Sequence, residues 1–271
     1  MKDYPALDVR TASSDLLLAI VDDFAPIAVD DSGGMVRLFF STAASRDAAA
    51  AAITASFEVH AVDVPDEDWA RRSQDNLLPV TVGRLTVAPP WAIAAPNAAD
   101  ALASTIVILP SMGFGTGHHA TTRLCLDALQ QLDLDGRSVL DVGTGSGVLA
   151  FATDRLGAAR SVGIDSDEDA VQAARDNLPL NPAARRVTFE VADLAAAPLA
   201  AADVVVANLT GALLVRSAAV LLAAVKPGGR LVVSGLQSHE RDAVVASLAP
   251  AISVERERED EDWVAITMKK P

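Results

Sequence analysis

The chain has 271 residues, 51% of them hydrophobic, and a formal net charge of −14. The hydrophobic share is large enough for a packed core, so a disordered chain is not expected, and the length suits two domains. An acidic surface repels phosphate backbones and attracts basic proteins, so we expect no direct contact with nucleic acid. Solubility alone explains the charge equally well.

Cysteine usage and hydropathy indicate the compartment. The single cysteine, Cys125, has no partner for an intramolecular disulfide, which is typical of a reducing compartment. The start of the chain lacks the apolar core of a signal peptide, and no apolar run approaches the roughly 20 residues of a membrane helix. We therefore expect a soluble cytoplasmic protein that does not enter membranes, and we expect a monomer.

Strand and helix signals alternate in the first 64 residues. Strands are predicted at 7–11, 35–40 and 57–64, and helices at 13–24 and 45–56. The turn Asp31-Ser-Gly-Gly34 precedes the strand at 35–40. The order strand, helix, strand, strand, helix, strand is typical of a small ferredoxin-like α+β domain, which we predict over residues 1–64 as a substrate-recognition domain.

Residues 65–104 are predicted to connect this domain to the rest of the chain. Pro65 opens a short helix that ends at Pro79, and a strand is predicted at 80–88. Residues 92–104 are rich in alanine and carry no clear pattern.

A second domain is predicted over residues 105–271. Its strands are expected at 138–143, 159–165, 187–193, 203–209, 229–235, 252–258 and 262–269, and its helices at 147–157, 168–177, 211–225 and 238–249. Such alternation indicates a parallel sheet with helices on both faces. The fold class is therefore α/β, with a doubly wound, Rossmann-like sheet of seven strands.

The run Asp141-Val-Gly-Thr-Gly-Ser-Gly147 lies between an apolar strand and a helix. Gly143 permits a tight turn, and Gly145 and Gly147 let a ligand and the helix approach the backbone closely. A purely structural strand-to-helix turn would use the same glycines, so this motif is weak by itself.

A carboxylate follows on the next strand, in Gly163-Ile-Asp165. Asp165 lies 22 residues after Gly143, and a carboxylate at this distance can accept both hydroxyls of a ribose. The alternative is that Asp165 caps the helix that begins near Glu168. The two motifs together favour a nucleoside cofactor.

Glycine spacing separates two classes of cofactor. The dinucleotide pattern G-x-G-x-x-G, started at Gly143, requires a glycine where Val148 stands. Started at Gly145, it ends at Ala150, which only the looser form of the pattern accepts. Two strands after the last helix resemble the methyltransferase version of the sheet, in which a seventh strand is inserted antiparallel. S-adenosylmethionine is therefore favoured over NAD.

Polar residues end the third and fourth strands of this domain. Asp193 can accept a hydrogen bond from the exocyclic amine of adenine, and a solvated loop acid is an equal alternative. Asn208 ends the run Asp203-Val-Val-Val-Ala-Asn208 at the edge where open parallel sheets bind ligands. Its carbonyl oxygen can accept a hydrogen bond from a substrate amine.

A glycine-rich loop precedes a helix at residues 112–122. Its glycines at 113, 115 and 117 allow it to close over a ligand, and Thr121 and Thr122 offer hydroxyls at the start of the helix. The paired histidines at 118 and 119 have no acidic or cysteine ligands at supporting spacing, so we predict no metal.

The sequence Phe114-Gly-Thr-Gly-His-His-Ala-Thr-Thr122 resembles the signature Phe-Gly-Thr-Gly-Thr-His-Pro-Thr-Thr of the methyltransferases that modify ribosomal protein L11. Other segments that resemble this family are spread over most of the chain. They are Asp68–Arg71, Ala88–Trp91, Val139–Gly147, Gly163–Asp165, Val206–Leu209, Lys226–Gly229 and Asp262–Val264.

This resemblance implies an S-adenosylmethionine-dependent protein-lysine methyltransferase. The family transfers methyl groups to amines, on lysine side chains and the N-terminus, of a basic ribosomal protein that the N-terminal domain recognises. Four residues are implied as cofactor contacts: Thr122, Gly143, Asp165 and Asn208. Gly145 and Asp193 complete the predicted cofactor site, and Asn208 is also the predicted catalytic residue.

The chain departs from the family pattern at His118, Ala120, Thr144 and the pair Leu209-Thr210. These departures spare the predicted cofactor residues, so they bear on the substrate more than on the reaction. Four other interpretations of the sequence stay open. They are methylation of another protein or of a small molecule, a module that binds S-adenosylmethionine without turnover, and a nicotinamide dehydrogenase. The intact Asn208 favours turnover, and the N-terminal domain favours a protein substrate.

Overall fold

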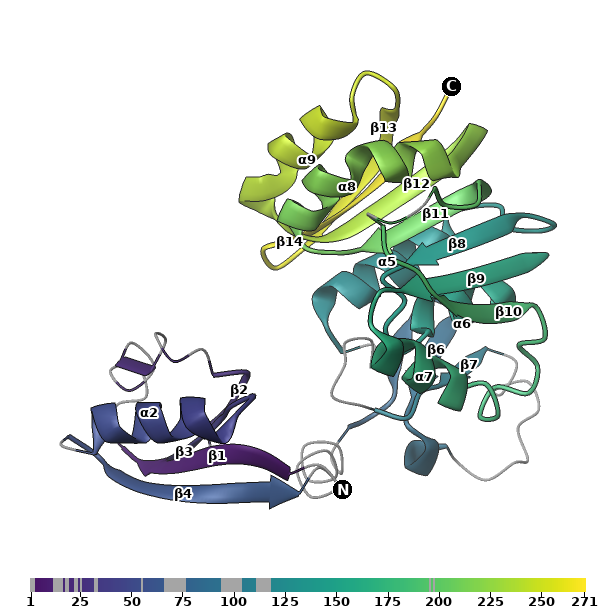
Figure 1. The fold of residues 1–271 in the computed structure, drawn as a ribbon. Coiled ribbons are helices and arrows are strands. Elements are labelled where there is room, and N and C mark those ends of the chain that lie inside the picture. The colour runs from purple at the N-terminus through teal and green to yellow at the C-terminus, as the bar shows by residue number, and fades with distance from the viewer. Residues whose placement is uncertain are drawn as a thin grey trace. The chain divides into compact units, whose positions relative to one another are not determined.

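The computed structural model describes residues 3–11, 17, 20–21, 24, 26–31, 34–54, 56–65, 77–93, 104–110, 118–194, 196 and 198–271. The chain divides into two compact units, Met1–Asn76 and Leu77–Pro271 (Figure 1). The domain boundaries expected at 64 and 104 stay predictions, and residues 80–88 of the expected connector form strands of the second unit.

The first unit has a four-stranded antiparallel sheet in the order β2-β3-β1-β4. The elements described in this unit are β1 (Asp3–Arg10), β2 (Ala28–Asp31), β3 (Met35–Phe39), α2 (Ala43–Ile53) and β4 (Glu58–Pro65). This strand order confirms the ferredoxin-like domain. Helix α2 begins after Thr42, whose hydroxyl accepts the N–H of Ser45 at 3.1 Å. The helix predicted at 13–24 lies largely outside the described residues.

The second unit is built on a seven-stranded sheet in the order β10-β9-β8-β11-β12-β14-β13. Its strands are β8 (Ser138–Val142), β9 (Arg160–Asp165), β10 (Val187–Val191), β11 (Ala202–Asn208), β12 (Val225–Gln237), β13 (Ser253–Asp260) and β14 (Trp263–Lys269). The first five are parallel, and β14 runs antiparallel between β12 and β13. The doubly wound sheet and its inserted seventh strand are therefore confirmed.

Helices cover both faces of this sheet (Figure 1). They are α5 (Ala120–Gln130), α6 (Val148–Arg155) and α7 (Glu168–Asp176) on one face, and α8 (Gly211–Ala224) and α9 (Arg241–Leu248) on the other. Strand β11 has apolar side chains on both faces, so both faces need a cover. Val204 and Val206 pack in the core under α5, α6 and α7, whereas Val205 packs in the core under α8 and α9. Among the described residues, no helix is both long enough and apolar enough to cross a membrane.

The single strand predicted at 80–88 is wrong, because the chain forms a hairpin there. Strands β5 (Val80–Val82) and β6 (Leu85–Ala88) pair antiparallel, and β7 (Thr105–Val107) joins β6 in parallel. Gly83 makes the turn with a φ of +56°, and a Cβ at this position would meet the Oε1 atom of Gln130 at 2.6 Å. The positive φ favours glycine at this turn.

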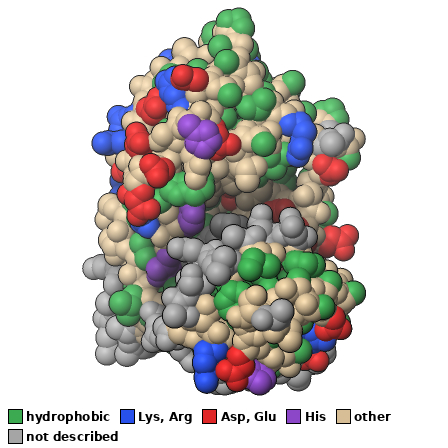
Figure 2. Space-filling model, turned by 90° about the vertical axis from the view of Figure 1, so that its left-hand side faces the viewer, with side chains coloured by type: hydrophobic (Ala, Val, Ile, Leu, Met, Phe, Trp, Pro, Cys, Tyr) green, Lys and Arg blue, Asp and Glu red, His purple; other side chains and the backbone are tan. Residues whose placement is uncertain are grey.

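The outer strand of the large sheet, β13, is almost entirely charged and exposed. Its Glu255 bonds Arg230 at 2.8 Å, and its Glu257 bonds Arg241 at 2.9 Å. Figure 2 shows acidic and basic side chains gathered on the upper part of the face that it draws. The second unit therefore presents a strongly charged surface at this sheet edge.

Gly147 at the start of α6 offers a test of the packing. Its φ is +85°, and an added Cβ would lie 2.6 Å from the Cζ atom of Phe189. Gly228 has a similar φ of +74° with open space around it. We expect Gly147→Ala to lower the free energy of unfolding by about 2–4 kcal/mol, from backbone strain plus overpacking. Gly228→Ala should cost only the strain of about 1–2 kcal/mol. Equal losses in urea unfolding would contradict the packing assigned to Phe189.

Candidate active site

The predicted site residues of the second domain gather at one edge of the large sheet. Because β10, β9, β8 and β11 are parallel neighbours, their carboxyl ends meet at this edge. Asp193 follows β10, Asp165 ends β9, the glycine turn follows β8, and Asn208 ends β11. The sheet thus brings together four segments that the sequence separates by up to 65 residues.

The glycine turn after β8 is bound to the end of β9 by its backbone. The N–H groups of Gly143 and Thr144 both donate to the carbonyl oxygen of Ile164, at 2.9 Å each. Gly143 has a φ of +72°, and a Cβ there would lie 2.4 Å from the Cδ2 atom of Leu209. Gly143 therefore packs directly against Leu209 at the end of β11. The positive φ and this close contact explain why glycine stands at this position.

The carboxylate of Asp165 organises this turn. Its Oδ2 atom accepts the N–H of Gly145 at 3.1 Å, and its Oδ1 atom accepts the N–H of Asp167 at 3.1 Å. The alternative that Asp165 caps the following helix is wrong, because α7 is capped by Asp167, whose side chain accepts the N–H of Asp169 at 2.9 Å. Asp165 is partly exposed, so its free lone pairs remain open to a ligand.

Beneath the turn lies a fully buried carboxyl group, Asp141. Its Oδ2 atom accepts the hydroxyl of Thr144 at 2.6 Å and the N–H of Ala150 at 3.1 Å. Its Oδ1 atom is buried and has no hydrogen-bond partner among the described residues. Burial raises the pKa of Asp141 to about 7, and the two hydrogen bonds that favour its charged form only partly oppose this rise.

The remaining predicted residues differ in their surroundings. Thr122 is buried in the first turn of α5, where its N–H donates to the carbonyl oxygen of His119 at 3.1 Å. Asp193 is exposed two residues beyond β10. The half-buried side chain of Asn208 makes no hydrogen bond to any other residue that the structure describes. The loop glycines 113, 115 and 117 lie outside the described residues.

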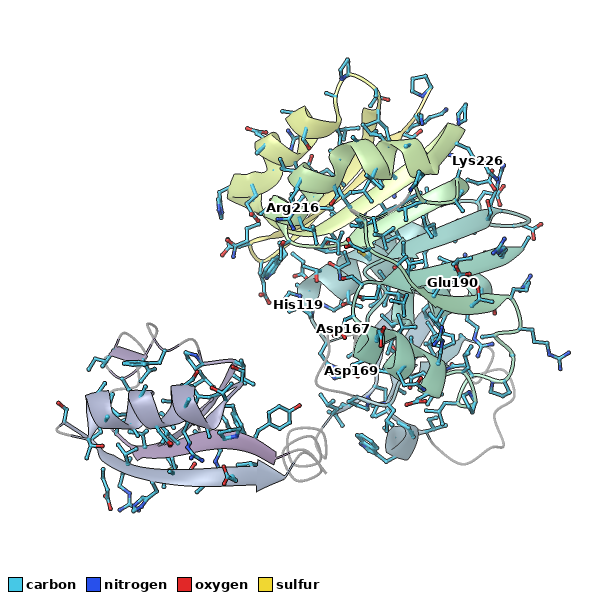
Figure 3. The ribbon with its side chains drawn as sticks, in the orientation of Figure 1. His119, Asp167, Asp169, Glu190, Arg216 and Lys226 are labelled. Carbon is cyan, nitrogen blue, oxygen red and sulfur yellow. The ribbon has the colours of Figure 1, made fainter. Side chains whose placement is uncertain are left out.

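Two aromatic side chains at this edge, His119 and Trp263, were not among the predicted site residues. Trp263 begins β14 opposite Gln237, and because β14 is antiparallel its start lies at the carboxyl end of β12. His119, which is labelled in Figure 3, caps α5. Its ring packs edge-to-face on that of Trp263, with ring centroids 4.9 Å apart. The sequence shows both residues, Trp263 in a segment that resembles the family and His119 in the histidine pair. Their contact could not be predicted, because it joins residues far apart in the chain.

The edge fits a nucleoside cofactor in its donor set. The partly exposed carboxylate of Asp165 can accept ribose hydroxyls, and it lies against the backbone of the glycine turn, where it accepts the N–H of Gly145. In the described part of the chain, no group of three or more His, Cys, Asp or Glu side chains is arranged to hold a metal ion.

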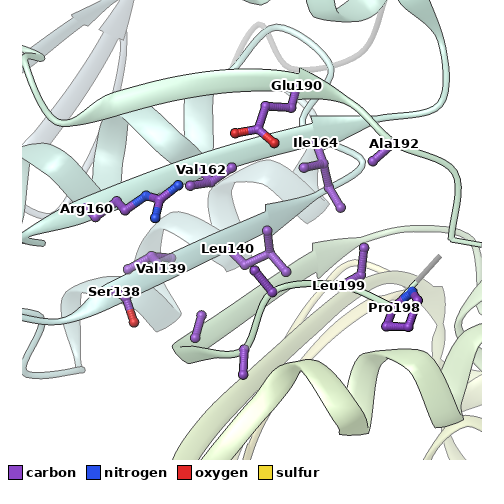
Figure 4. A pocket seen from close by; sticks show the side chains of 13 residues that line it. Ser138, Val139, Leu140, Arg160, Val162, Ile164, Glu190, Ala192, Pro198 and Leu199 are labelled. Carbon is purple, nitrogen blue, oxygen red and sulfur yellow. The ribbon is translucent and has the colours of Figure 1, made fainter.

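A hollow of about 190 Å³ lies elsewhere, on the sheet face opposite α6 (Figure 4). Its apolar floor includes Leu140, Val162 and Ile164, and Arg160 and Glu190 lie at its rim. The chain between β10 and β11 contributes no described helix to cover this face. None of the predicted site residues lines this hollow, so it is separate from the site at the carboxyl edge.

The strand order with antiparallel β14, and the glycine turn packed against Asp165 and the end of β11, define an S-adenosylmethionine-dependent methyltransferase. Residues 35–271 match the family model described as "Ribosomal protein L11 methyltransferase (PrmA)". The chain therefore belongs to the ribosomal protein L11 methyltransferase family.

Two relatives agree with this family, and a solved structure agrees with the fold. The ribosomal protein L11 methyltransferase of Burkholderia multivorans is 40% identical over 214 residues, which is 79% of this chain and 68% of the relative. That of Aliivibrio salmonicida is 37% identical over 221 residues, covering 81% and 73%. A crystal structure of the ribosomal protein L11 methylase from Lactobacillus delbrueckii subsp. bulgaricus has a TM-score of 0.65 at 24% identity, over 72% of this chain and 99% of that one, and supports the fold.

Asp141 should make stability depend on pH. Its pKa in the folded protein, about 7, exceeds the value of about 3.9 expected when unfolded. Its contribution is therefore full below about pH 4 and is lost as the pH rises to about 7, a fall of up to about 4 kcal/mol. Asp141→Asn keeps a carbonyl acceptor for Thr144 and Ala150 without the charge. We expect this variant to lose less stability than the wild type between pH 4 and 7, measured by chemical unfolding.

Asp203→Asn serves as the control for this experiment. Hydrogen bonds from Ser138 lower the pKa of Asp203 to about 2, so its contribution is lost only as the pH falls below about 4. The control should leave the slope between pH 4 and 7 unchanged. If Asp141→Asn also left it unchanged, the buried carboxyl group would not titrate in this range.

Asp165→Ala should weaken the binding of S-adenosylmethionine by about 1–3 kcal/mol, because it removes charge-assisted hydrogen bonds to the ribose. The change also frees the N–H of Gly145, which Asp165 accepts at 3.1 Å. Asp167→Ala is a matched control, because it removes a neighbouring carboxylate that caps α7. Titration calorimetry would rule out the ribose role if Asp165→Ala bound the cofactor as tightly as the wild type.

Proposed function

We propose that this chain transfers methyl groups from S-adenosylmethionine to amines of ribosomal protein L11, on lysine side chains and the N-terminus. The observation that carries the proposal is the place of Asn208. Its side chain has no hydrogen-bond partner among the described residues, and its strand end packs on Gly143 of the glycine turn. A free amide beside the cofactor turn suits the orientation of an incoming amine.

The cofactor, when bound, supplies a methyl group on a positively charged sulfur. Asp165 and the glycine turn would hold the ribose of the cofactor. Thr122 would contact the cofactor from α5, and Asp193 would accept a hydrogen bond from the adenine amine. These contacts leave the end of β11 for the acceptor. The carbonyl oxygen of Asn208 would accept an N–H of the amine and so direct the nitrogen lone pair toward the methyl group.

The acceptor amine must lose a proton before it can attack. A lysine side chain in water has a pKa of about 10.4, and burial or a nearby positive charge lowers this value. His119 and Trp263 place two rings at the same edge, where they would exclude water from the amine. Positioning of this kind contributes up to about 7–11 kcal/mol to the lowering of a barrier in ideal cases.

The protein substrate is expected to be basic, which suits an enzyme with a net charge of −14. We propose that the N-terminal unit recognises the ribosomal protein, and that the enzyme acts in the cytoplasm as a monomer without contacting nucleic acid or membranes.

Incubation with purified ribosomal protein L11 and isotopically labelled cofactor, followed by mass spectrometry of the peptides, tests the proposal. We expect label on lysine side chains or on the N-terminal amine. A second, unrelated basic protein of similar size is the control for substrate identity. Label on the control alone would overturn the proposed substrate, and absence of label on both would overturn the proposed turnover.

Asn208→Ala should lower kcat by about 100-fold while the affinity for S-adenosylmethionine changes little, because the lost amide chiefly orients the acceptor. Turnover at saturating cofactor and calorimetric titration of the cofactor measure the two effects separately. Thr210→Ala, two residues further at an exposed position, is the matched control. Collapsed affinity with preserved turnover at saturation would make Asn208 a cofactor ligand only.

A further inference from the structure

Arg123 occupies a position that is unfavourable for a cation. It lies in the first turn of α5, where the aligned peptide dipoles create a partial positive charge. Its guanidinium is held by two partners: Nη2 and Nε contact the Oδ2 atom of Asp260 at 2.7 and 3.3 Å, and Nη1 donates to the carbonyl oxygen of His118. These partners offset the unfavourable field at the helix start.

The two partners of Arg123 are each next to one member of the aromatic pair His119–Trp263. The carbonyl group of His118 directly precedes His119, which caps α5. Asp260 lies opposite Trp263 in the last pair of the β13–β14 hairpin. The tight turn between them includes Glu261 in a left-handed conformation, with a φ of +57°. One guanidinium therefore joins the segment that bears His119 to the segment that bears Trp263.

We infer that Arg123, with Asp260, is a positioning residue for the methyl-accepting amine. The ion pair fixes the edge-to-face contact of His119 and Trp263, and this contact sets one side of the space where the amine enters. The inference rests on the proposed function, because it assigns the acceptor to this edge. Surface ion pairs of such exposure contribute little to stability, so the effect is expected on the reaction more than on unfolding.

A second ion pair between the same elements provides a matched control. Arg258 of β13 lies 3.8 Å from Asp127 of α5, one helical turn beyond Arg123. It joins the same strand to the same helix, but it contacts neither the turn at His118 nor the end of the hairpin. Arg258→Gln therefore removes a comparable charge without touching the aromatic pair.

Steady-state kinetics with the protein substrate test the inference. Arg123→Gln and Asp260→Asn should each lower kcat about tenfold, with KM for the protein and the affinity for S-adenosylmethionine within about twofold of the wild type. The double variant should be no slower than the slower single variant, because both changes remove one interaction. Arg258→Gln should keep the wild-type kcat.

Three kinetic results would overturn the inference. They are an unchanged kcat in Arg123→Gln, an equal loss in Arg258→Gln, and a loss of cofactor affinity that accounts for the slower reaction. Melting temperatures of all variants identify any loss that comes from unfolding. Arg123→Lys adds a further check, because a lysine cannot bridge both partners with a planar fork and should recover little of the rate.

A spectroscopic arm separates failure of this inference from failure of the proposed function. The indole N–H resonance of Trp263, assigned with Trp263→Phe, should shift in Arg123→Gln and Asp260→Asn and stay in place in Arg258→Gln. An inactive wild-type enzyme would overturn the proposed function, whereas this shift would still report on the aromatic pair. An unmoved resonance in both variants would overturn the positioning role of Arg123.

Discussion

The site depends on a carboxyl group that no solvent reaches. Asp141 accepts hydrogen bonds from Thr144 in the glycine turn and from Ala150 in α6, so one buried side chain ties strand, turn and helix together. In a low-dielectric interior such bonds are strong and directional. The backbone of the turn is thereby presented at the sheet edge in one conformation, and the other parts of the site are arranged around it.

The parallel sheet supplies the second level of organisation. Asp165 reaches the turn because β9 lies beside β8, and Asn208 reaches it because β11 lies on the other side. The antiparallel insertion of β14 then brings Trp263 to the same edge from the end of the chain. Each functional side chain is thus placed by the end of a rigid strand or by the first turn of a helix.

Much of this arrangement follows from local sequence. The run Val204-Val-Val206 is buried on both faces, which is the pattern of a central parallel strand, and the glycines at 143, 145 and 147 mark the turn that the structure shows. The pairing of Asp165 with the turn also follows from its place at the end of the next strand.

The remaining features depend on contacts that no local pattern encodes. The hairpin at Gly83 escaped prediction because its strands are three and four residues long and the apolar alternation continues through the turn. The short strand β2 was not located, since its four residues carry little periodicity. Arg123 and Asp260 are 137 residues apart, and nothing in the sequence near either of them indicates the other.

The charged outer strand β13 has a consequence for behaviour in concentrated solution. An edge strand exposes unpaired backbone groups to which another chain can add as a further strand. Here the alternating glutamates and arginines are held beside that edge by ion pairs with Arg230, Arg241 and Asp127. A second copy docking edge to edge would disturb these ion pairs, which disfavours the addition of a further strand at this end of the sheet.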